Sequence, residues 1–248
     1  MKLTVEGLSV RYGTTQAIEA LDVAAHPGEV LAVIGPNGSG KSSLVKAVAG
    51  LVRHDGVIRF DGSPVRPERI GYMPQDIGAR AALTVLEAVL LGRLGRLGLR
   101  VRPDDLAAVE AVLGELDLMP LASRYLGELS GGQRQLVFLA QALASEPALL
   151  LLDEPISALD IRHQLEVMEI VLRMTRARSL TTLVILHDLN IAARFADAVM
   201  VMRQGRVVCC GKPDDVIELE MVASVFGVQA ALSSAPDGRL VVTPLRAL

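Results

Sequence analysis

The sequence has few of the residues that cross-link small secreted domains or stack on nucleic-acid bases. Its 248 residues include two cysteines, Cys209 and Cys210, which are adjacent and so exclude a disulfide framework. We interpret them as buried spectator thiols and expect a reducing, cytosolic compartment. Tryptophan is absent, aromatic residues make up 3% of the chain and the net charge is −3, so we expect no nucleic-acid partner.

Long apolar runs are also missing, although the hydrophobic share is 51% and the mean hydropathy is +0.41. Runs such as Ala148 to Leu152 and Thr182 to Leu186 fall far short of the ~18 residues of a membrane-spanning helix. We interpret them as buried strands. The N-terminus has no apolar signal segment, so we expect no secretion. The length suits one large domain, or a core domain with a smaller subdomain.

The order of the predicted elements indicates an α/β fold. Alternating residues over Leu3 to Tyr12 and Gly56 to Phe60 predict short antiparallel strands near the N-terminus. Further along, apolar runs alternate with helical patterns, which predicts a mostly parallel sheet covered by helices. The predicted strands are 30–34, 149–152, 182–186 and 198–202, with edge strands at 206–210 and around Val241; the predicted helices are 41–52, 163–176 and 189–195.

An inserted α-helical subdomain is predicted from residue 77, where the sequence becomes rich in Ala, Leu and Arg. A helix is predicted after Pro103-Asp104, and another from Gln133. The apolar residues at helical spacing are Leu106, Val109, Leu113 and Leu116 in the first helix, and Leu136, Leu139, Ala140 and Leu143 in the second. We predict a core of residues 1–76 and 136–248 and a helical subdomain of residues 77–135.

A glycine-rich segment from Gly35 to Ser42 matches G-x-x-x-x-G-K-[ST] and lies between a predicted strand and a predicted helix. Its glycines let backbone N–H groups turn toward phosphates, and the helix start adds a favourable dipole. Lys41 is predicted to bridge the β and γ phosphates, and Ser42 to bind Mg²⁺. The predicted ATP-binding residues here are Gly35, Asn37, Gly38, Ser39, Gly40, Lys41, Ser42 and Ser43.

Two carboxylates, Asp153 and Glu154, follow the apolar strand at 149–152. We predict that Asp153 holds Mg²⁺ through its water shell and that Glu154 is the general base that orients or deprotonates the attacking water. The alternative is that they only cap a following helix. His187 follows another strand at the edge where ligands gather, which indicates a γ-phosphate sensor. The other histidines, His26, His54 and His163, are interpreted as surface or packing residues.

The segment Leu129-Ser-Gly-Gly-Gln133 lies just before a predicted helix, where hydroxyl and backbone donors favour an anion. This segment resembles the signature motif of ABC ATPases. Together with GPNGSGKS and LLLLDE in the same order, the resemblance covers nearly the whole chain. It implies a P-loop NTPase core and a homodimer in the ATP-bound state. The signature residues Ser130, Gly131, Gly132 and Gln133 would then act on the partner's ATP.

The resemblance also assigns roles outside these motifs. Tyr12 is similar to the aromatic residue that stacks on adenine, and Gln75 to the glutamine that links Mg²⁺ to the permease interface, so we group Gln75 with Glu154 and His187 as catalytic. Ser157-Ala-Leu-Asp160 resembles the D-loop that crosses the dimer contact, with Asp160 as its acidic residue. The metal site would consist of Ser42, Gln75 and Asp153. Ile156 replaces the threonine common in the family, and we expect little loss from this change.

Longer stretches around residues 83–93, 159–164 and 186–193 resemble importers of iron-siderophore, haem or cobalamin. This resemblance implies a separate integral-membrane permease, an extracytoplasmic substrate-binding protein and a peripheral place on the cytoplasmic face of the cell membrane. The first alternative is the ATPase of another ABC transporter, which imports metal ions or exports lipid. A non-transport ABC ATPase is less favoured, and a P-loop kinase or GTPase would leave the signature unexplained.

A small basic run contains Arg93, Arg96, Arg100 and Arg102. Such runs are usually solvated loops. The sharper hypothesis is that some of these arginines face the anionic inner leaflet or the permease, because the run lies in the predicted helical subdomain.

Overall fold

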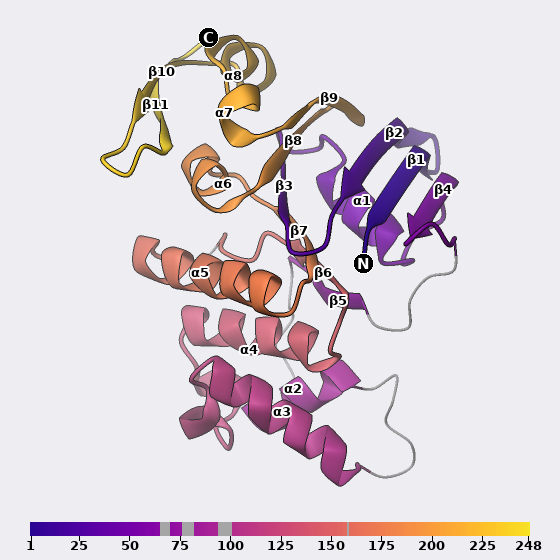
Figure 1. Cartoon of the computed structure of the whole chain (residues 1–248), viewed down its shortest axis with the longest axis vertical. Helices are drawn as coiled ribbons and strands as arrows, with labels where there is room; N and C mark the ends of the chain where they lie inside the picture. Colours follow the sequence, from indigo (N-terminus) through magenta and orange to yellow (C-terminus); the bar gives the residue numbers. More distant parts are fainter. Residues whose placement is uncertain (65–69, 76–81, 94–100, 158) are drawn as a thin grey trace.

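The computed structural model describes residues 1–64, 70–75, 82–93, 101–157 and 159–248. A six-stranded sheet runs through the middle of this part of the chain, in the order β5-β6-β7-β3-β8-β9 (Figure 1). Its first five strands are parallel and β9 pairs antiparallel with β8. The strands are β3 (Val30–Ile34), β5 (Ile70–Met73), β6 (Leu149–Asp153), β7 (Thr181–Ile185), β8 (Ala198–Arg203) and β9 (Arg206–Gly211). The predicted parallel sheet is confirmed.

A second sheet, in the order β2-β1-β4, lies beside the first and is antiparallel. It contains β1 (Leu3–Tyr12), β2 (Thr15–Ala25) and β4 (Asp55–Phe60), which confirms the predicted antiparallel strands near the N-terminus. A hairpin near the C-terminus pairs β10 (Val228–Ser234) with β11 (Leu240–Ala247).

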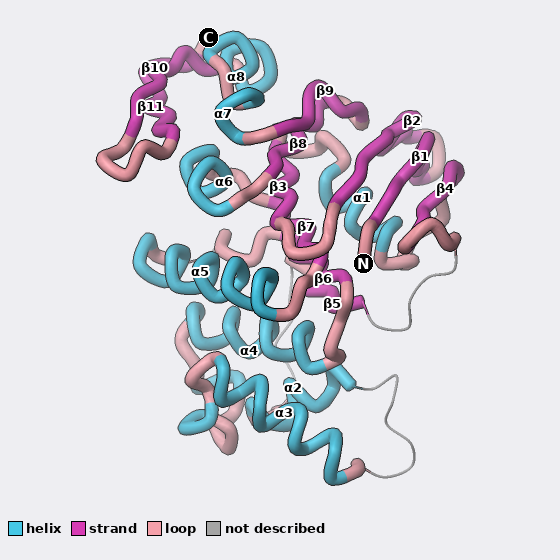
Figure 2. The backbone as a smooth tube through the Cα atoms, in the orientation of Figure 1, coloured by secondary structure: helices cyan, strands magenta, loops and turns pink. Residues whose placement is uncertain are grey.

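The helices separate into layers around the central sheet (Figures 1 and 2). Helix α1 lies between this sheet and the N-terminal sheet, whereas α4, α5 and α6 lie on the other side. The helices are α1 (Lys41–Val48), α2 (Val85–Leu90), α3 (Pro103–Glu115), α4 (Gly131–Ala144), α5 (Ile161–Ala177), α6 (Leu189–Phe195), α7 (Pro213–Val216) and α8 (Leu219–Phe226). Short 3₁₀ turns cover Leu91–Arg93, Met119–Leu121 and Leu126–Glu128.

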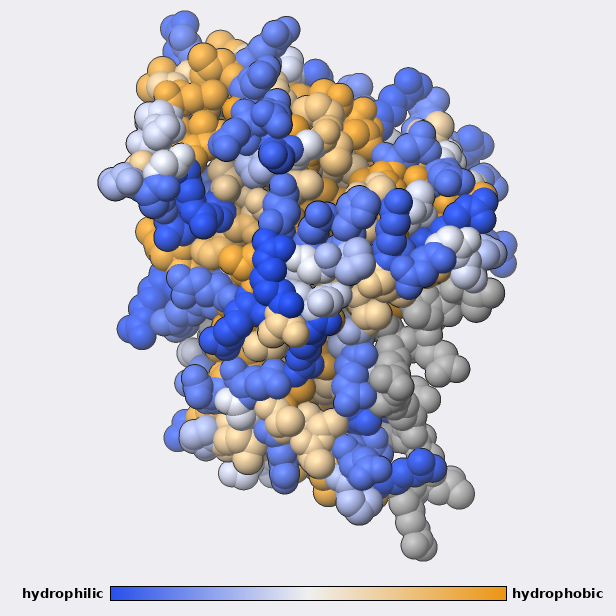
Figure 3. Space-filling model, viewed as in Figure 1, coloured by the Kyte–Doolittle hydropathy of each residue, from blue (hydrophilic) through white to orange (hydrophobic). Residues whose placement is uncertain are grey.

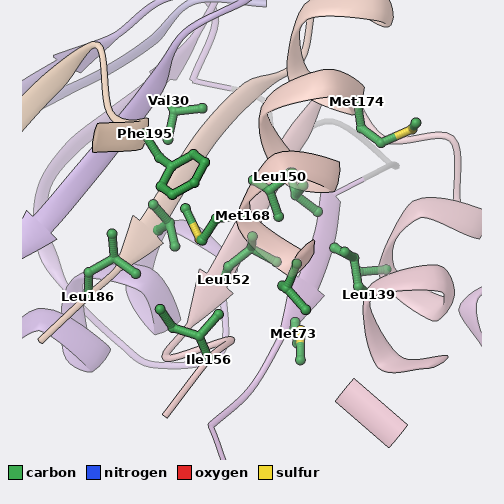
Figure 4. Packing of buried hydrophobic residues seen from close by; sticks show 14 of the residues in the cluster. Val30, Met73, Leu139, Leu150, Leu152, Ile156, Met168, Met174, Leu186 and Phe195 are labelled. Atoms are coloured by element: carbon green, nitrogen blue, oxygen red, sulfur yellow. The ribbon is translucent and has the colours of Figure 1, made fainter. Parts of the chain in front are cut away.

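Alternating side chains of the central strands fill two cores, one on each face of the sheet. In β6, Leu149 and Leu151 pack toward α1 and the N-terminal sheet, while Leu150 and Leu152 pack toward α4 and α5. Figure 4 shows the second core, where Leu150 and Leu152 meet Met168. Burial on both faces explains why these strands are continuous apolar runs.

The predicted helical subdomain corresponds to α2, α3 and the start of α4, at the lower end of Figure 1. The predicted boundary at residues 135 and 136 falls inside α4, whose later residues Leu139 and Leu143 pack in the same core as the sheet. The division at that residue stays a prediction. In α3 the predicted apolar face is buried at Val109 and Leu113, but Leu106 is exposed.

Arg93 is buried, so it is not one of the arginines of the basic run that face a membrane or a permease. Its side chain is 5% exposed and Nε donates to Asp105 Oδ1 at 2.8 Å. Nη1 donates to the carbonyl of the last residue of α4 at 2.9 Å. The hydrogen bond from Arg93 lowers the pKa of Asp105. Arg102 is exposed. The other two arginines of the basic run, Arg96 and Arg100, lie outside the described residues.

Replacing Arg93 with glutamine is therefore expected to destabilise the fold. The shorter side chain cannot reach Asp105, so a carboxylate that is 6% exposed loses its ion-pair partner and keeps the backbone N–H of Arg102 as a donor. We expect Arg93→Gln to lower the Tm by several degrees, while exposed Arg102→Gln changes it little. Thermal unfolding followed by circular dichroism measures both. Equal Tm values for the two variants would show that the buried ion pair adds no stability.

The C-terminal elements carry a hydrophobic surface, at the upper end of Figure 3. Leu219, Leu245 and Leu248 are among the exposed large apolar residues. Asn190 of α6 holds the hairpin, because its side chain donates to the carbonyl of Val242 and accepts from its N–H. Within the described ranges, no helix combines the length and apolar character needed to cross a membrane.

Candidate active site

A cavity of about 580 Å³ opens above the phosphate loop, residues 35–42, at the end of β3. It brings together residues from three distant parts of the sequence: the β1–β2 turn, the phosphate loop and the carboxyl ends of the central strands. The lining residues are Tyr12, Thr15, Gln16, Ala17, Asn37, Gly38, Ser39, Gly40, Lys41, Ser42, Ser43, Gln75, Glu154 and His187.

The phosphate loop depends on glycine at two close approaches. A Cβ on Gly35 would lie 2.1 Å from the carbonyl oxygen of Met202, and one on Gly40 would lie 2.5 Å from that of Ala17. Gly40 also has φ 101°, a left-handed conformation that strains other residues. Both carbonyl oxygens belong to the backbone, so a shift large enough to admit a Cβ would disturb the neighbouring strands. These two glycines therefore allow the loop to curve back and start α1 at Lys41.

Lys41 points back across this loop. Its Nζ donates to the carbonyl oxygens of Gly35 at 2.8 Å and Pro36 at 3.0 Å. The side chain is nearly buried, and this burial lowers the pKa of Lys41, an effect that the negative charges of Glu154 and Asp153 oppose. The ammonium group is thus already in the cavity, held by neutral acceptors that an anionic ligand would replace.

Ser42 and Asp153 meet beside the first turn of α1. Ser42 Oγ donates to Asp153 Oδ1 at 3.0 Å, although the two residues are far apart in sequence. Asp153 is 2% exposed, and this burial raises the pKa of its carboxyl group, while the hydrogen bond from Ser42 lowers it. Burial disfavours the charged carboxylate, and a cation bound beside it would offset that cost, so the site favours a cation.

Glu154 is clamped by two side chains that the sequence analysis also selected. Gln75 Nε2 donates to Oε2 at 2.9 Å, and His187 Nε2 lies 2.6 Å from Oε1. Glu154 itself has φ 55°, a left-handed conformation unusual outside glycine, at the sharp turn after β6. Its side chain is 12% exposed, whereas His187 is 41% exposed. Both carboxylate oxygens are thereby fixed toward the cavity.

Tyr12 forms part of the cavity wall, at the end of β1, and is 46% exposed. An exposed ring on a cavity wall offers a face on which a flat ligand stacks. The neighbouring wall residues Thr15, Gln16 and Ala17 were not predicted from sequence. They lie at the start of β2, a strand that the sequence analysis missed, and they carry no motif.

The predicted signature residues do not line this cavity. Ser130 is the N-cap of α4: its Oγ accepts from the N–H of Gln133 at 3.3 Å, and its own N–H donates to Gln133 Oε1 at 3.1 Å. Ser130 and Gly131 are exposed, whereas Gly132 is buried. The structure therefore presents the start of a long helix to the outside, away from the phosphate loop of the same chain.

Asp160 also caps a helix. Its Oδ1 accepts from the N–H of His163 at 3.0 Å at the start of α5. Like the signature, Asp160 is outside the lining of the cavity. Ala158, within the predicted D-loop motif, lies outside the described residues. The predicted site is thus divided into the cavity residues and two exposed helix starts.

Comparisons with a family model and with known proteins point to the same family. Residues 18–157 match the family model described as "ABC transporter". The hemin import ATP-binding protein HmuV of Myxococcus xanthus is 40% identical, with 98% of this chain and 100% of that protein covered. The ferric enterobactin transport ATP-binding protein FepC of Escherichia coli is 34% identical over 98% and 94% of the two chains.

A solved structure supports the same family at the level of the backbone. It is an inward-facing conformation of a transporter described as of the metal-chelate ABC type. The TM-score is 0.88 at 29% identity, and 98% of this chain and 97% of that chain are covered. The chain therefore belongs to the ABC transporter family, as one of its ATP-hydrolysing cassettes.

Proposed function

We propose that the chain is the ATPase of an importer, which binds Mg-ATP with a second copy of itself and powers a separate permease in the uptake of a metal chelate. The observation that carries this proposal is the clamped carboxylate of Glu154, which shares a cavity with the buried ammonium group of Lys41. A fixed base facing a phosphate cradle is the arrangement that hydrolysis of a phosphoanhydride needs.

ATP binding is supported by the size and polarity of the cavity. Its volume of about 580 Å³ lies within the ~300–1,000 Å³ typical of small-molecule sites. Tyr12 would stack on the adenine. The backbone N–H groups of the phosphate loop and the start of α1 would bind the β and γ phosphates, and Lys41 would exchange its carbonyl partners for phosphate oxygens.

The residues beside α1 fit Mg²⁺, which prefers oxygen ligands and keeps several waters. We propose that Ser42 Oγ and Asp153 hold the ion, with the side-chain oxygen of Gln75 nearby. The hydroxyl and carboxylate oxygens already lie 3.0 Å apart, and burial disfavours the charge of the Asp153 carboxylate. The ion would supply charge stabilisation to the phosphates, and Asp153 would gain the compensating charge that its burial demands.

In the proposed reaction, Glu154 accepts a proton from a water molecule that attacks the γ-phosphorus. The bond between the γ-phosphorus and the β–γ bridging oxygen breaks, and ADP leaves opposite the attacking oxygen. Gln75 and His187 orient Glu154 through its two oxygens, and His187, which lines the cavity, would also contact the γ-phosphate. Lys41 neutralises charge on the transferred group.

A second copy would complete each site. The start of α4 is exposed at Ser130 and Gly131, and these residues lie outside the cavity of their own chain. We propose that Ser130, Gly131, Gly132 and Gln133 bind the γ-phosphate held by the partner, and that Asp160 lies at the dimer contact. A helix N-terminus is suited to this role because its free N–H groups favour an anion.

The transported ligand is proposed from the relatives, whose names refer to hemin, ferric enterobactin and metal chelates. We propose a haem, ferric siderophore or cobalamin system with an integral-membrane permease and an extracytoplasmic binding protein. This chain would sit at the cytoplasmic face of the membrane. The ligand is chosen outside the ATPase, so the cassette alone does not name it.

Replacing Lys41 with alanine is expected to lower both ATP hydrolysis and ATP-driven uptake strongly. The chain is co-purified from detergent-solubilised membranes with its permease, reconstituted, and tested with labelled ferric siderophore, haem and cobalamin. We expect ATP-driven uptake of one ligand, lowered at least ~100-fold by Lys41→Ala because one cation that stabilises the transition state is lost. The matched control is Lys212→Ala, an exposed lysine outside the cavity, which should transport normally.

Two other outcomes would contradict the proposal. Uptake of a free metal ion, or export of lipid, would leave the ATPase assignment intact and replace the metal-chelate class. If no permease were recovered and nucleic acid or ribosomes stimulated the ATPase activity instead, a non-transport role would replace transport.

A further inference from the structure

We propose that His163 is a positioning residue that locks the signature glycine Gly132 to the D-loop residue Asp160. This inference rests on the proposed function, in which Gly132 binds the partner's γ-phosphate and Asp160 lies at the dimer contact. His163 lies in the first turn of α5, and the sequence alone suggested no role for it.

The first contact joins His163 to Asp160. His163 Nδ1 lies 2.8 Å from Asp160 Oδ1, and the backbone N–H of His163 donates to the same oxygen at 3.0 Å. These two bonds lower the pKa of Asp160, so the carboxylate stays charged. Asp160 therefore contacts both the imidazole ring and the backbone N–H of His163 through the same charged oxygen.

The second contact joins the same ring to the signature helix. A Cβ built on Gly132 would lie 2.8 Å from Cδ2 and 3.1 Å from Cγ of His163, so a larger residue fits here only if the ring moves. Gly131, one residue earlier, has open space at the corresponding position. The ring cannot swing aside freely, because a rotation would separate Nδ1 from Asp160.

Gln164, the next residue, fixes the segment that precedes Asp160. Its Nε2 donates to the carbonyl oxygens of Ile156 at 3.3 Å and Leu159 at 3.0 Å. The first turn of α5 therefore holds the backbone that precedes Asp160. His163 also contacts Gly132 of α4, so a shift of Asp160 would displace the start of the signature helix.

The inference predicts a specific effect on turnover. A signature displaced by about 1 Å would still leave the ATP pocket of its own chain intact, but it would misplace donors on the partner's γ-phosphate. We expect His163→Ala to lower kcat roughly 10-fold or more. The affinity of the monomer for ATP, measured with a fluorescent ATP analogue, should stay within about 2-fold of wild type, because His163 is outside the cavity.

A double-mutant cycle separates positioning from general destabilisation. Gly132→Ala pushes the ring off its position, so adding His163→Ala to Gly132→Ala should lower kcat by less than about 2-fold further. The matched pair uses Gly131→Ala, whose new Cβ meets nothing, and His163→Ala should keep its full effect in that background. The exposed His26→Ala serves as the unchanged control, and Tm values of all variants are compared.

The outcomes distinguish this inference from the proposed function. If wild type hydrolyses ATP, and His163→Ala either matches it or is fully additive with Gly132→Ala, the positioning role is wrong and the ATPase assignment stands. If wild type shows no hydrolysis that depends on Lys41, the proposed function itself fails. The positioning role would also be wrong if His163→Ala lowered the Tm strongly and kcat, calculated per folded molecule, equalled that of wild type.

Discussion

Replacing Glu154 with glutamine is expected to lower kcat for ATP hydrolysis by roughly 10²–10⁴-fold, the usual contribution of a general base. The substitution preserves size, but an amide cannot take the proton of the attacking water. It also changes the clamp, because the amide NH₂ group cannot accept a hydrogen bond. Lys41 and the phosphate loop remain, so ATP binding should persist.

The same variant should make the ATP-bound dimer visible. If the dimer closes on ATP and opens after hydrolysis, Glu154→Gln with Mg-ATP should elute as a dimer in size-exclusion chromatography, and wild type mainly as a monomer. The matched control is Glu169→Gln, an exposed glutamate on α5, which should hydrolyse ATP normally. Near-normal turnover of Glu154→Gln would remove Glu154 from the role of base.

The parts of the site that sequence predicts well are those whose position follows from local rules. The phosphate loop must lie between β3 and α1, and a residue directly after a parallel strand must lie at the carboxyl edge of the sheet. For this reason Glu154 and His187, far apart in sequence, were both expected there, and the structure places them 2.6 Å apart. Their catalytic roles stay predictions.

Strand β2 was missed because its buried residues do not alternate regularly along the sequence. Its buried residues Ile18 and Leu21 are three apart, so the alternation that marks a strand is broken. Ala20 has φ 46°, and the pairing register with β1 shifts in this region, as in a β-bulge. Because β2 was missed, the cavity wall at Thr15 and Gln16 was missed with it.

Contacts that depend on packing between distant segments were also out of reach. Arg93 appeared as one member of a basic run, yet its partner Asp105 lies across the subdomain in the next long helix. Nothing in the sequence assigned His163 a role at the site, because the proposed role depends on its contact with Gly132, a residue of another helix. Spacing along one helix cannot reveal either neighbour.

Asp153→Asn should separate stability from function. Burial raises the pKa of the Asp153 carboxyl group, so the charged form is disfavoured in the nucleotide-free fold. Asparagine keeps the shape without the charge, and we expect a higher Tm in EDTA at pH 7, by ~2–4 °C for each kcal/mol relieved. ATP hydrolysis should fall by about 100-fold or more, because the ligand that holds Mg²⁺ loses its charge.

The pH dependence of this difference has a definite sign. A carboxyl group with a raised pKa in the fold adds stability only while it is protonated, and this contribution is lost as the pH rises through its folded pKa. The Tm advantage of Asp153→Asn should therefore be largest at pH 7–8 and shrink as the pH falls toward the range where Asp153 protonates. An advantage that grows on acidification would contradict the burial argument.

Adding Mg-ATP should give wild type a higher Tm than Asp153→Asn, the reverse of their order in EDTA. A ligand that binds the folded state at about 100 times its Kd stabilises that state by ~2.7 kcal/mol, so wild type should gain Tm. Asp153→Asn should gain much less, since its weakened metal site no longer offsets the phosphate charge. Because Asp153→Asn is the more stable protein without ligand, unfolding cannot explain its loss of activity. If both proteins gained Tm equally, Asp153 would not belong to the Mg²⁺ site.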